Sequence, residues 1–225
     1  MKAPTPVKGW RLFLGEVGVI VLGVLIALGA QQAVEEIRIR GDVRTFRETI
    51  DHEISLNLYV YDFRSRQVDC VKWQIDELND WLAQARAGKN VPGINGNSPF
   101  ALSPYRSAWE NKDADVFANL PYAVRLKYAE FYDELSNNME IRLLEVKAWN
   151  ELATYREPGP ITLGDRRKIR SVLGPARSLN ALLPQNLEVS RKIATDLGIK
   201  PRTPDNIPQD FFKRVLVCGR MLAKD

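Results

Sequence analysis

The sequence predicts an all-α protein in which an N-terminal transmembrane helix continues into an antiparallel bundle of long helices. One apolar segment, Leu12 to Ala33, runs directly into charged residues with a helical period. Further along the chain, apolar residues recur at steps of three and four, which is typical of helices packed on one face. Alternating strand patterns are nearly absent. We therefore divide the chain into a basic tail (1–11), a transmembrane helix (12–33) and a helical soluble domain (34–225).

The apolar segment is long enough for a membrane anchor. About 20 helical residues, each advancing roughly 1.5 Å, cross the hydrocarbon core of a bilayer. The alternative is a cleaved secretory signal, because the apolar run after Glu16 is short and Ala27-Leu28-Gly29 would offer small residues for cleavage. The stretch from Glu35 to Arg47 continues the helical pattern without an extended segment at the supposed cut, so we favour an anchor that stays attached.

Small residues and one carboxylate inside the anchor predict a contact with another membrane helix. A carboxylate in an apolar segment is costly, and it usually finds a partner or a wet cavity. Small residues allow two helix backbones to approach closely. The predicted contact comprises Glu16, Gly18, Gly23, Ala27 and Ala30. It would serve self-association or docking to another membrane subunit. The alternative is that Glu16 extends to the membrane interface or pairs with a nearby basic side chain.

The two cysteines, Cys70 and Cys218, bear on the compartment. An even pair in a chain otherwise poor in cysteine is compatible with an oxidising compartment. We predict a disulfide, although two unrelated buried thiols are the alternative. Basic residues flank both ends of the anchor, so they do not decide its orientation. With the disulfide, we expect a bacterial inner-membrane protein with a cytoplasmic N-terminus and a periplasmic domain.

The first part of the soluble domain is predicted to be a spine helix followed by a long loop. An apolar stripe runs from Ile39 to Leu82 and indicates one helix that ends at Gly88. Glycines and prolines between 88 and 104 cannot continue it, and long loops in compact domains are often functional. A short helix is expected from about 103 to 117.

Three further helices are predicted. The first follows Asn119-Leu120-Pro121, interpreted as a cap with proline in the first turn, and ends before Glu157. Its expected apolar stripe is Val124, Tyr128, Phe131, Leu135, Met139, Leu143, Val146 and Trp149. The second starts at a capping box, Thr162 with Asp165, and ends at Gly198, with a kink or break near Pro175 and Pro184. The last is an amphipathic helix, which carries Cys218 and contains Phe211, Phe212, Val215, Leu216 and Leu222.

Several of these residues also carry a family resemblance. They are Glu16, Gly18, Val19, Val21, Leu22, Gly23, Val24, Ala27, Leu28, Glu35 and Glu36, then Ser107-Ala108-Trp109-Glu110, Asn119-Leu120-Pro121, Phe131-Tyr132 and Leu135. In them the chain resembles a family of uncharacterised bacterial proteins with one N-terminal transmembrane helix, over roughly the first 140 residues. The resemblance implies a membrane-anchored helical protein and brings no activity with it.

Motifs for catalysis or metal binding are missing from the sequence. The single histidine, His52, has no second histidine or cysteine at helical spacing, and neither a nucleophile elbow nor a phosphate-binding glycine loop is present. We therefore expect no enzyme activity, no cofactor and no metal. The densest basic cluster is Arg166, Arg167, Lys168 and Arg170. It is interpreted as a solvated face, with lipid headgroups or an acidic partner as the alternative.

The charge balance and the anchor leave two classes of function. The net charge of +4 and pI near 9.1 come from interspersed acids and bases, so nucleic acid is not an expected partner. Membrane lipid and other membrane subunits are the expected partners. Our first hypothesis is an accessory or scaffold subunit of a larger membrane complex. The alternative is a ligand-binding or sensing module of the cell envelope, with the loop 88–104 at the mouth of its pocket.

Overall fold

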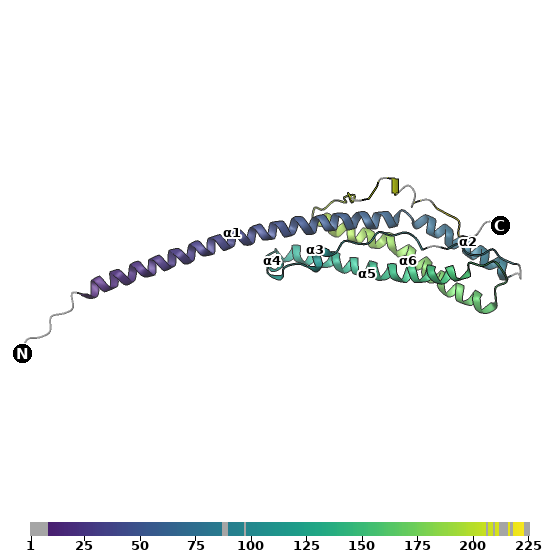
Figure 1. Ribbon diagram of the computed structural model, residues 1–225, viewed down its shortest axis with the longest axis horizontal. Coiled ribbons are helices and arrows are strands. Elements are labelled where there is room, and N and C mark those ends of the chain that lie inside the picture. Colours follow the sequence, from purple (N-terminus) through teal and green to yellow (C-terminus); the bar gives the residue numbers. More distant parts are fainter. Residues whose placement is uncertain are drawn as a thin grey trace, which may run out of the picture. The chain divides into compact units, whose positions relative to one another are not determined.

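The computed structural model describes residues 9–86, 90–96, 98–205, 207–208, 210–211, 216 and 218–222. These residues are helical or irregular, with two isolated bridges and no β-strand among them (Figure 1). The predicted all-α class is therefore confirmed. The chain forms two compact units. The anchor unit comprises Met1–Arg47 and Asp113–Leu120, and the bundle unit comprises Glu48–Lys112 and Pro121–Asp225.

The anchor unit is dominated by the first part of helix α1 (Gly9–Ser65). Near its N-terminus, α1 contains a stretch long and apolar enough to cross a membrane, and none of that stretch is buried. Beyond it, Arg38 forms ion pairs with Glu35 at 2.6 Å and Asp42 at 2.9 Å. Side chains three or four residues apart are neighbours on a helix, so these pairs support helical structure beyond the apolar stretch. A short helix, α4 (Ala114–Ala118), belongs to the same unit.

In the bundle unit, the second part of α1 runs parallel to α5 (Tyr122–Leu152). The Tyr128 hydroxyl donates a 2.6 Å hydrogen bond to Asp51, and further along both helices Arg64 pairs with Glu145. The residue numbers at successive contacts increase together in both helices, so the two helices run in the same direction.

Helix α6 (Leu163–Asp196) runs antiparallel to the other long helices. Arg191 contacts Asp62 at the end of α1 at 2.7 Å, and Arg177 contacts Asp76 of α2 (Val68–Arg86) at 2.6 Å. Asn186 likewise donates to Asn138 of α5, and Asp196 contacts Lys127 of α5 at 3.4 Å. At successive contacts the residue number in α6 falls as the residue number in the partner helix rises. Helix α6 is therefore antiparallel to α1, α2 and α5.

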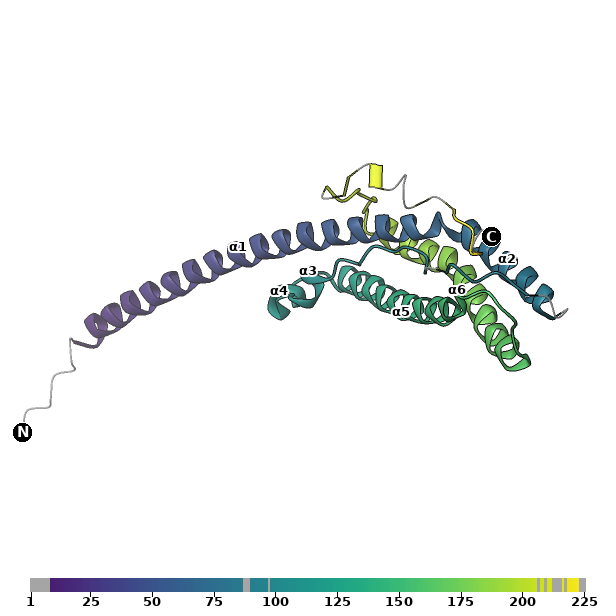
Figure 2. The same cartoon turned by 45° about the vertical axis from the view of Figure 1, so that its right-hand side comes forward.

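A long crossover connects α2 to α5, because parallel neighbours cannot be joined by a tight turn. After α2 the chain returns along the bundle to the short helix α3 (Ser107–Glu110), as both ribbon views show (Figures 1 and 2). Glu53 of α1 accepts hydrogen bonds from the backbone N–H groups of Ala108 (2.7 Å) and Trp109 (3.2 Å). These bonds fix the start of α3 on the bundle.

The predicted spine is two helices and not one. It is interrupted by a turn at Arg66 and Gln67, where the Gln67 amide donates to the carbonyl of Phe100 at 2.8 Å. Similarly, the short helix expected at 103–117 is divided into α3 and α4. Asp113 caps α4 by accepting from the N–H groups of the next turn.

Other helix boundaries also differ from the sequence prediction. Asn119 is the C-cap of α4, and Pro121 occupies the N-cap position of α5 rather than its first turn. Helix α6 continues through Pro175 and Pro184, so the chain is not broken there, and the predicted kink stays a prediction. Residues 218–222 of the predicted last helix are irregular, while Phe212, Val215 and Gly88 lie outside the described residues.

Both ends of α6 were predicted correctly. The Thr162 side chain accepts from the N–H of Asp165, whose carboxylate accepts from the N–H of Thr162, so the capping box is formed. Gly198 has a positive φ of 78° just beyond the helix. Its N–H bonds to Thr195 O, and the N–H of Ile199 bonds to Ala194 O. This pair of bonds is the Schellman arrangement, for which glycine is the preferred residue.

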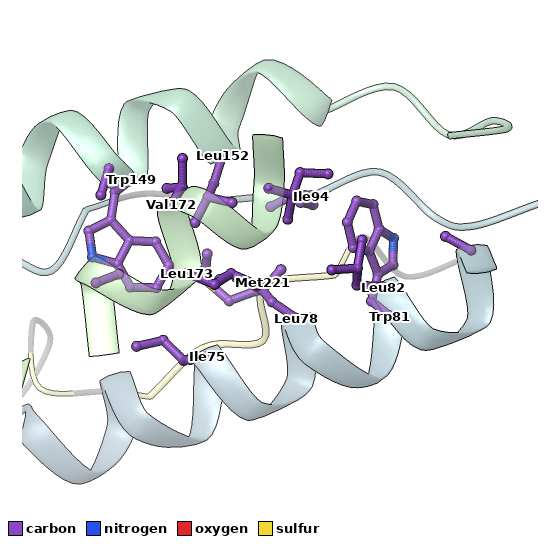
Figure 3. Close-up of a cluster of buried hydrophobic side chains, with 14 of the residues drawn as sticks. Ile75, Leu78, Trp81, Leu82, Ile94, Trp149, Leu152, Val172, Leu173 and Met221 are labelled. Carbon is purple, nitrogen blue, oxygen red and sulfur yellow. The ribbon is translucent and has the colours of Figure 1, made fainter. Parts of the chain in front are cut away.

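A hydrophobic core fills one end of the bundle (Figure 3). It combines side chains of α2, the crossover, the end of α5, the start of α6 and the C-terminal region. Its members include Ile75, Leu78, Trp81, Leu82, Ile94, Trp149, Leu152, Val172, Leu173 and Met221. Gly93, beside Ile94 in the crossover, lies so close to the chain that an added Cβ would be 1.7 Å from the carbonyl oxygen of Arg156. Only glycine fits there.

The described C-terminal residues 218–222 form a strap that is tied to α2. Cys218 is disulfide-bonded to Cys70, with their Cα atoms 5.6 Å apart. The backbone N–H of Met221 donates to Glu77 at 2.8 Å, and its carbonyl accepts from Asn95 of the crossover. The buried Met221 side chain thus completes the core from a distant part of the chain.

Candidate ligand cavity and membrane face

A cluster of charged and amide side chains crosses the interior of the bundle unit. Arg64 of α1 donates through Nε and Nη2 to the two carboxylate oxygens of Glu145 on α5. Arg64 Nη2 also reaches Asn180 of α6 at 3.2 Å, and Arg142 donates to Glu145 at 2.8 Å. The Arg64 and Glu145 side chains are only 4% and 1% exposed. We call these four residues the polar cluster.

Arg64 and Glu145 of the polar cluster stand where a helical stripe would place an apolar residue. Arg64 lies three residues after Tyr61, and Glu145 lies four residues before Trp149. The apolar stripe predicted on α5 instead included Leu143, whose side chain is 68% exposed. That part of the stripe was wrong. Following the strict three-and-four spacing through charged residues would have identified the buried positions.

Beside the polar cluster lies a cavity of about 240 Å³, which we call the Arg64 cavity. It is formed by α1, α5, one leucine of α6 and a segment of the crossover. Its lining residues are Val60, Tyr61, Arg64, Ala101, Leu102, Ser103, Pro104, Leu135, Asn138, Met139, Arg142, Leu143 and Leu183. Most of this lining is apolar, and its two charged residues are both arginines.

Crossover residues 101–104 border the cavity and are held in place from both sides. On one side, Arg142 donates to the carbonyl of Pro99. On the other, the Asn57 side chain donates to the carbonyl of Tyr105 at 2.7 Å and accepts from its N–H at 2.8 Å. The segment that the sequence assigned to a long loop, and to the mouth of a pocket, therefore lines the cavity.

Two hydrogen-bond donors on α1 have no partner in the described part of the chain. They are Nη1 of Arg64 and the hydroxyl of Tyr61, and both atoms are buried. Burial and the negative charge of Glu134 raise the pKa of the Tyr61 hydroxyl, while the amide of Asn138, which lies close but outside hydrogen-bond geometry, lowers it, so the group stays protonated. Unpaired buried donors are costly, which makes this pair the strongest indication of a binding site in the bundle unit.

The anchor residues predicted to form a contact fall on two sides of α1. A helix turns about 100° per residue, so Glu16, Gly23, Ala27 and Ala30 lie within about 60° of one another. We call these four residues the anchor face. Gly18 lies on the opposite side. A Cβ added at Gly18 or Gly23 would meet nothing within 4 Å, so both positions are open.

The basic cluster of α6 does not converge on one point. Arg166 is half buried and donates to the carbonyl of Ala85, whereas Arg167 and Lys168 are exposed. Arg170 instead borders a shallow depression that also contains Asp76. This distribution favours a solvated face over a single anion site.

Two further positions singled out in the sequence, His52 and Phe211, lie elsewhere in the bundle unit. His52 is exposed on α1. No group of three or more histidine, cysteine or acidic side chains in the described ranges could hold a metal ion. Phe211 is half buried and contacts Phe100 edge to face at 5.4 Å between ring centroids.

Comparison with known proteins yields no significant match, whether against family models, curated proteins or solved structures. The resemblance to an uncharacterised bacterial membrane family stays a prediction.

Proposed function

We propose that this chain is a single-pass membrane protein whose bundle unit binds a small ligand in the Arg64 cavity. It would act as a ligand-binding or sensing module of the cell envelope, without an enzymatic step. The observation that carries the proposal is the unpaired, buried Nη1 of Arg64 at an otherwise mostly apolar cavity. Sites for small molecules are typically apolar concavities with a few placed polar groups.

Membrane attachment is supported by the exposed apolar surface of α1. Val19, Ile20 and Ile26 are each more than half exposed, as are apolar residues on every other side of the same stretch. Such a continuous apolar surface is rare on soluble proteins and is covered when lipid surrounds the helix. We therefore take membrane lipid as the first partner.

The orientation we propose has a cytoplasmic N-terminus and a periplasmic bundle unit at a bacterial inner membrane. The disulfide between Cys70 and Cys218 supports it, since such bonds persist in oxidising compartments. Thiol reagent should leave both cysteines unmodified in protein extracted without reductant. Modification of both would contradict the proposed orientation.

The ligand-binding proposal is tested with photoreactive amphiphiles on the full-length chain in lipid nanodiscs. The probes are a diazirine-bearing decanoic acid and the matching decanol. We expect at least one of them to label peptides that contain residues 101–104 or 139–143. Leu143→Trp should reduce this labelling because it adds bulk at the cavity rim. Leu144→Trp is the matched control, since Leu144 is also exposed (56%) but does not line the cavity.

Labelling confined to α1 near the membrane, with none in the cavity peptides, would refute the ligand-binding proposal. It would favour our second candidate, an accessory subunit that docks to a larger complex through the anchor face. The specific observation behind that candidate is the alignment of Glu16 with Gly23, Ala27 and Ala30 on one side of α1.

The docking hypothesis has its own matched pair of substitutions. Gly23→Leu should lower the native mass of the protein extracted in mild detergent, because the side chain obstructs close helix approach. Gly29→Leu, on the opposite side of α1, should leave that mass unchanged. Neither added Cβ meets another atom of the chain within 4 Å, so the comparison reports on contacts between molecules. An unchanged mass for Gly23→Leu would remove this candidate.

A further inference from the structure

We infer that the ligand of the Arg64 cavity is a single-chain amphiphile that ends in a carboxylate. The inference rests on the proposed ligand-binding function and names the chemistry of the ligand. It follows from three features of the cavity, namely its charge, its unpaired donors, and its size and apolar lining.

The polar cluster carries one more positive charge than negative charge. Arg64 and Arg142 both donate to the single carboxylate of Glu145, and no acidic side chain is among the described residues that line the cavity. The Arg142 side chain is 24% exposed, so water screens part of this excess, and an arriving monoanion would balance what remains beside the cavity. A neutral ligand would leave the excess in place, and a cation would add to it.

The two unpaired donors suit the two oxygens of a carboxylate. Tyr61 and Arg64 are three residues apart on α1, so their side chains leave the same face of the helix. Nη1 of Arg64 would donate to one oxygen and the protonated Tyr61 hydroxyl to the other, once small side-chain movements bring these buried atoms to the cavity surface. Hydrogen bonds from a guanidinium to a carboxylate are among the stronger ones that proteins form.

The rest of the cavity accommodates an apolar chain. Beyond the donors its walls include Val60, Leu135 and Met139, and the exposed Leu143 extends the apolar surface to the rim. The volume of about 240 Å³ lies just below the range typical of drug-sized ligands. One alkyl chain fits that size, whereas a two-chain phospholipid does not.

The test compares headgroups on the unmodified full-length chain in nanodiscs of zwitterionic lipid. The diazirine-bearing decanoic acid is the probe, and unlabelled decanoate, decanol and decyltrimethylammonium compete with it at measured free concentrations. We expect decanoate to prevent labelling of the cavity peptides at a concentration about tenfold or more below that of decanol. Decyltrimethylammonium should compete least. No substitution is involved, so impaired folding cannot produce the result.

A conservative substitution then tests the second donor. Tyr61→Phe removes a hydroxyl that has no partner in the described residues, so it should leave the fold intact. It should weaken competition by decanoate severalfold and competition by decanol less, because a charged acceptor gains more from the Tyr61 hydroxyl than a neutral one. Tyr59→Phe is the control, because Tyr59 is absent from the cavity lining.

The outcomes separate this inference from the function on which it rests. Equal competition by decanoate and decanol would overturn the carboxylate assignment while leaving a ligand-binding cavity. Stronger competition by the cation would overturn it as well. If neither photoreactive probe labels the cavity peptides, the ligand-binding function fails together with the inference.

Discussion

Glu145→Leu should destabilise the bundle unit strongly, because it removes the carboxylate between two arginines. Arg64 is buried and would lose its ion pair, while Arg142 would lose its 2.8 Å hydrogen bond. Breaking a buried ion pair by removing one partner costs about 3–5 kcal/mol. For a domain of this size, that cost lowers the melting temperature by roughly 6–20 °C.

The structure also predicts that replacing Arg64 destabilises the bundle unit less than replacing Glu145. In Arg64→Met, Glu145 keeps its contact with Arg142, so no buried carboxylate is left unpaired. The losses are then the hydrogen bonds to Glu145 and Asn180 and some packing. We expect a cost of about 1–3 kcal/mol. Combining the two substitutions should recover stability relative to Glu145→Leu alone, because fewer charges remain buried without a partner.

Urea unfolding of the full-length chain in detergent, followed by helical circular dichroism, measures all four members of this cycle. Fluorescence of the five tryptophans follows the same transition, and its signal includes Trp149, which is fully buried one helical turn from Glu145. If the free energies of the two single substitutions add within about 0.5 kcal/mol in the double variant, the side chains are not coupled. The polar cluster would then not exist as described.

Three further predictions concern the core, the strap and alkaline pH. Gly93→Ala should lower the free energy of unfolding by about 3 kcal/mol or more, measured by thermal unfolding, because the added Cβ would meet the carbonyl of Arg156. Gly174→Ala is the control and should be tolerated, because Gly174 lies on an open helix surface. Replacing both bonded cysteines by alanine should lower the free energy of unfolding by about 2–5 kcal/mol, and reductant should lower it equally in the unmodified chain but not in the variant. Burial and the hydrogen bond to Glu53 raise the pKa of Tyr132 from its ordinary value of 10.0. Its contribution to stability is therefore complete below about pH 10 and is lost above it, so Tyr132→Phe should flatten the alkaline decline in the urea midpoint.

The sequence predicted those parts of the fold that local chemistry determines. The capping box at Thr162 and the glycine end at Gly198 depend on a few adjacent residues, and both were located correctly. The break at Gln67 could not be foreseen in the same way. It is accompanied by a hydrogen bond to Phe100, a residue far along the chain. Periodicity alone continues an apolar stripe across such a turn.

The candidate site was only partly accessible from the sequence. The loop 88–104 was identified as part of a pocket mouth, because glycines and prolines mark it. Its partners Arg64 and Glu145 were missed, since charged side chains are normally assigned to solvated faces. Their burial depends on each other, and α1 and α5 come together only through a parallel pairing that sequence reasoning did not predict.

Stability alone does not explain the polar cluster. Well-packed apolar residues in place of a buried ion pair are often as stabilising or more so, and the positions of Arg64 and Glu145 continue apolar stripes on both helices. The cluster also has one arginine more than its carboxylate balances, and one guanidinium nitrogen is left without a partner within the described residues. A purely structural cluster would be expected to satisfy its own charges. Departures from packing rules are typical of functional sites, and this one borders a cavity, which supports the ligand-binding proposal.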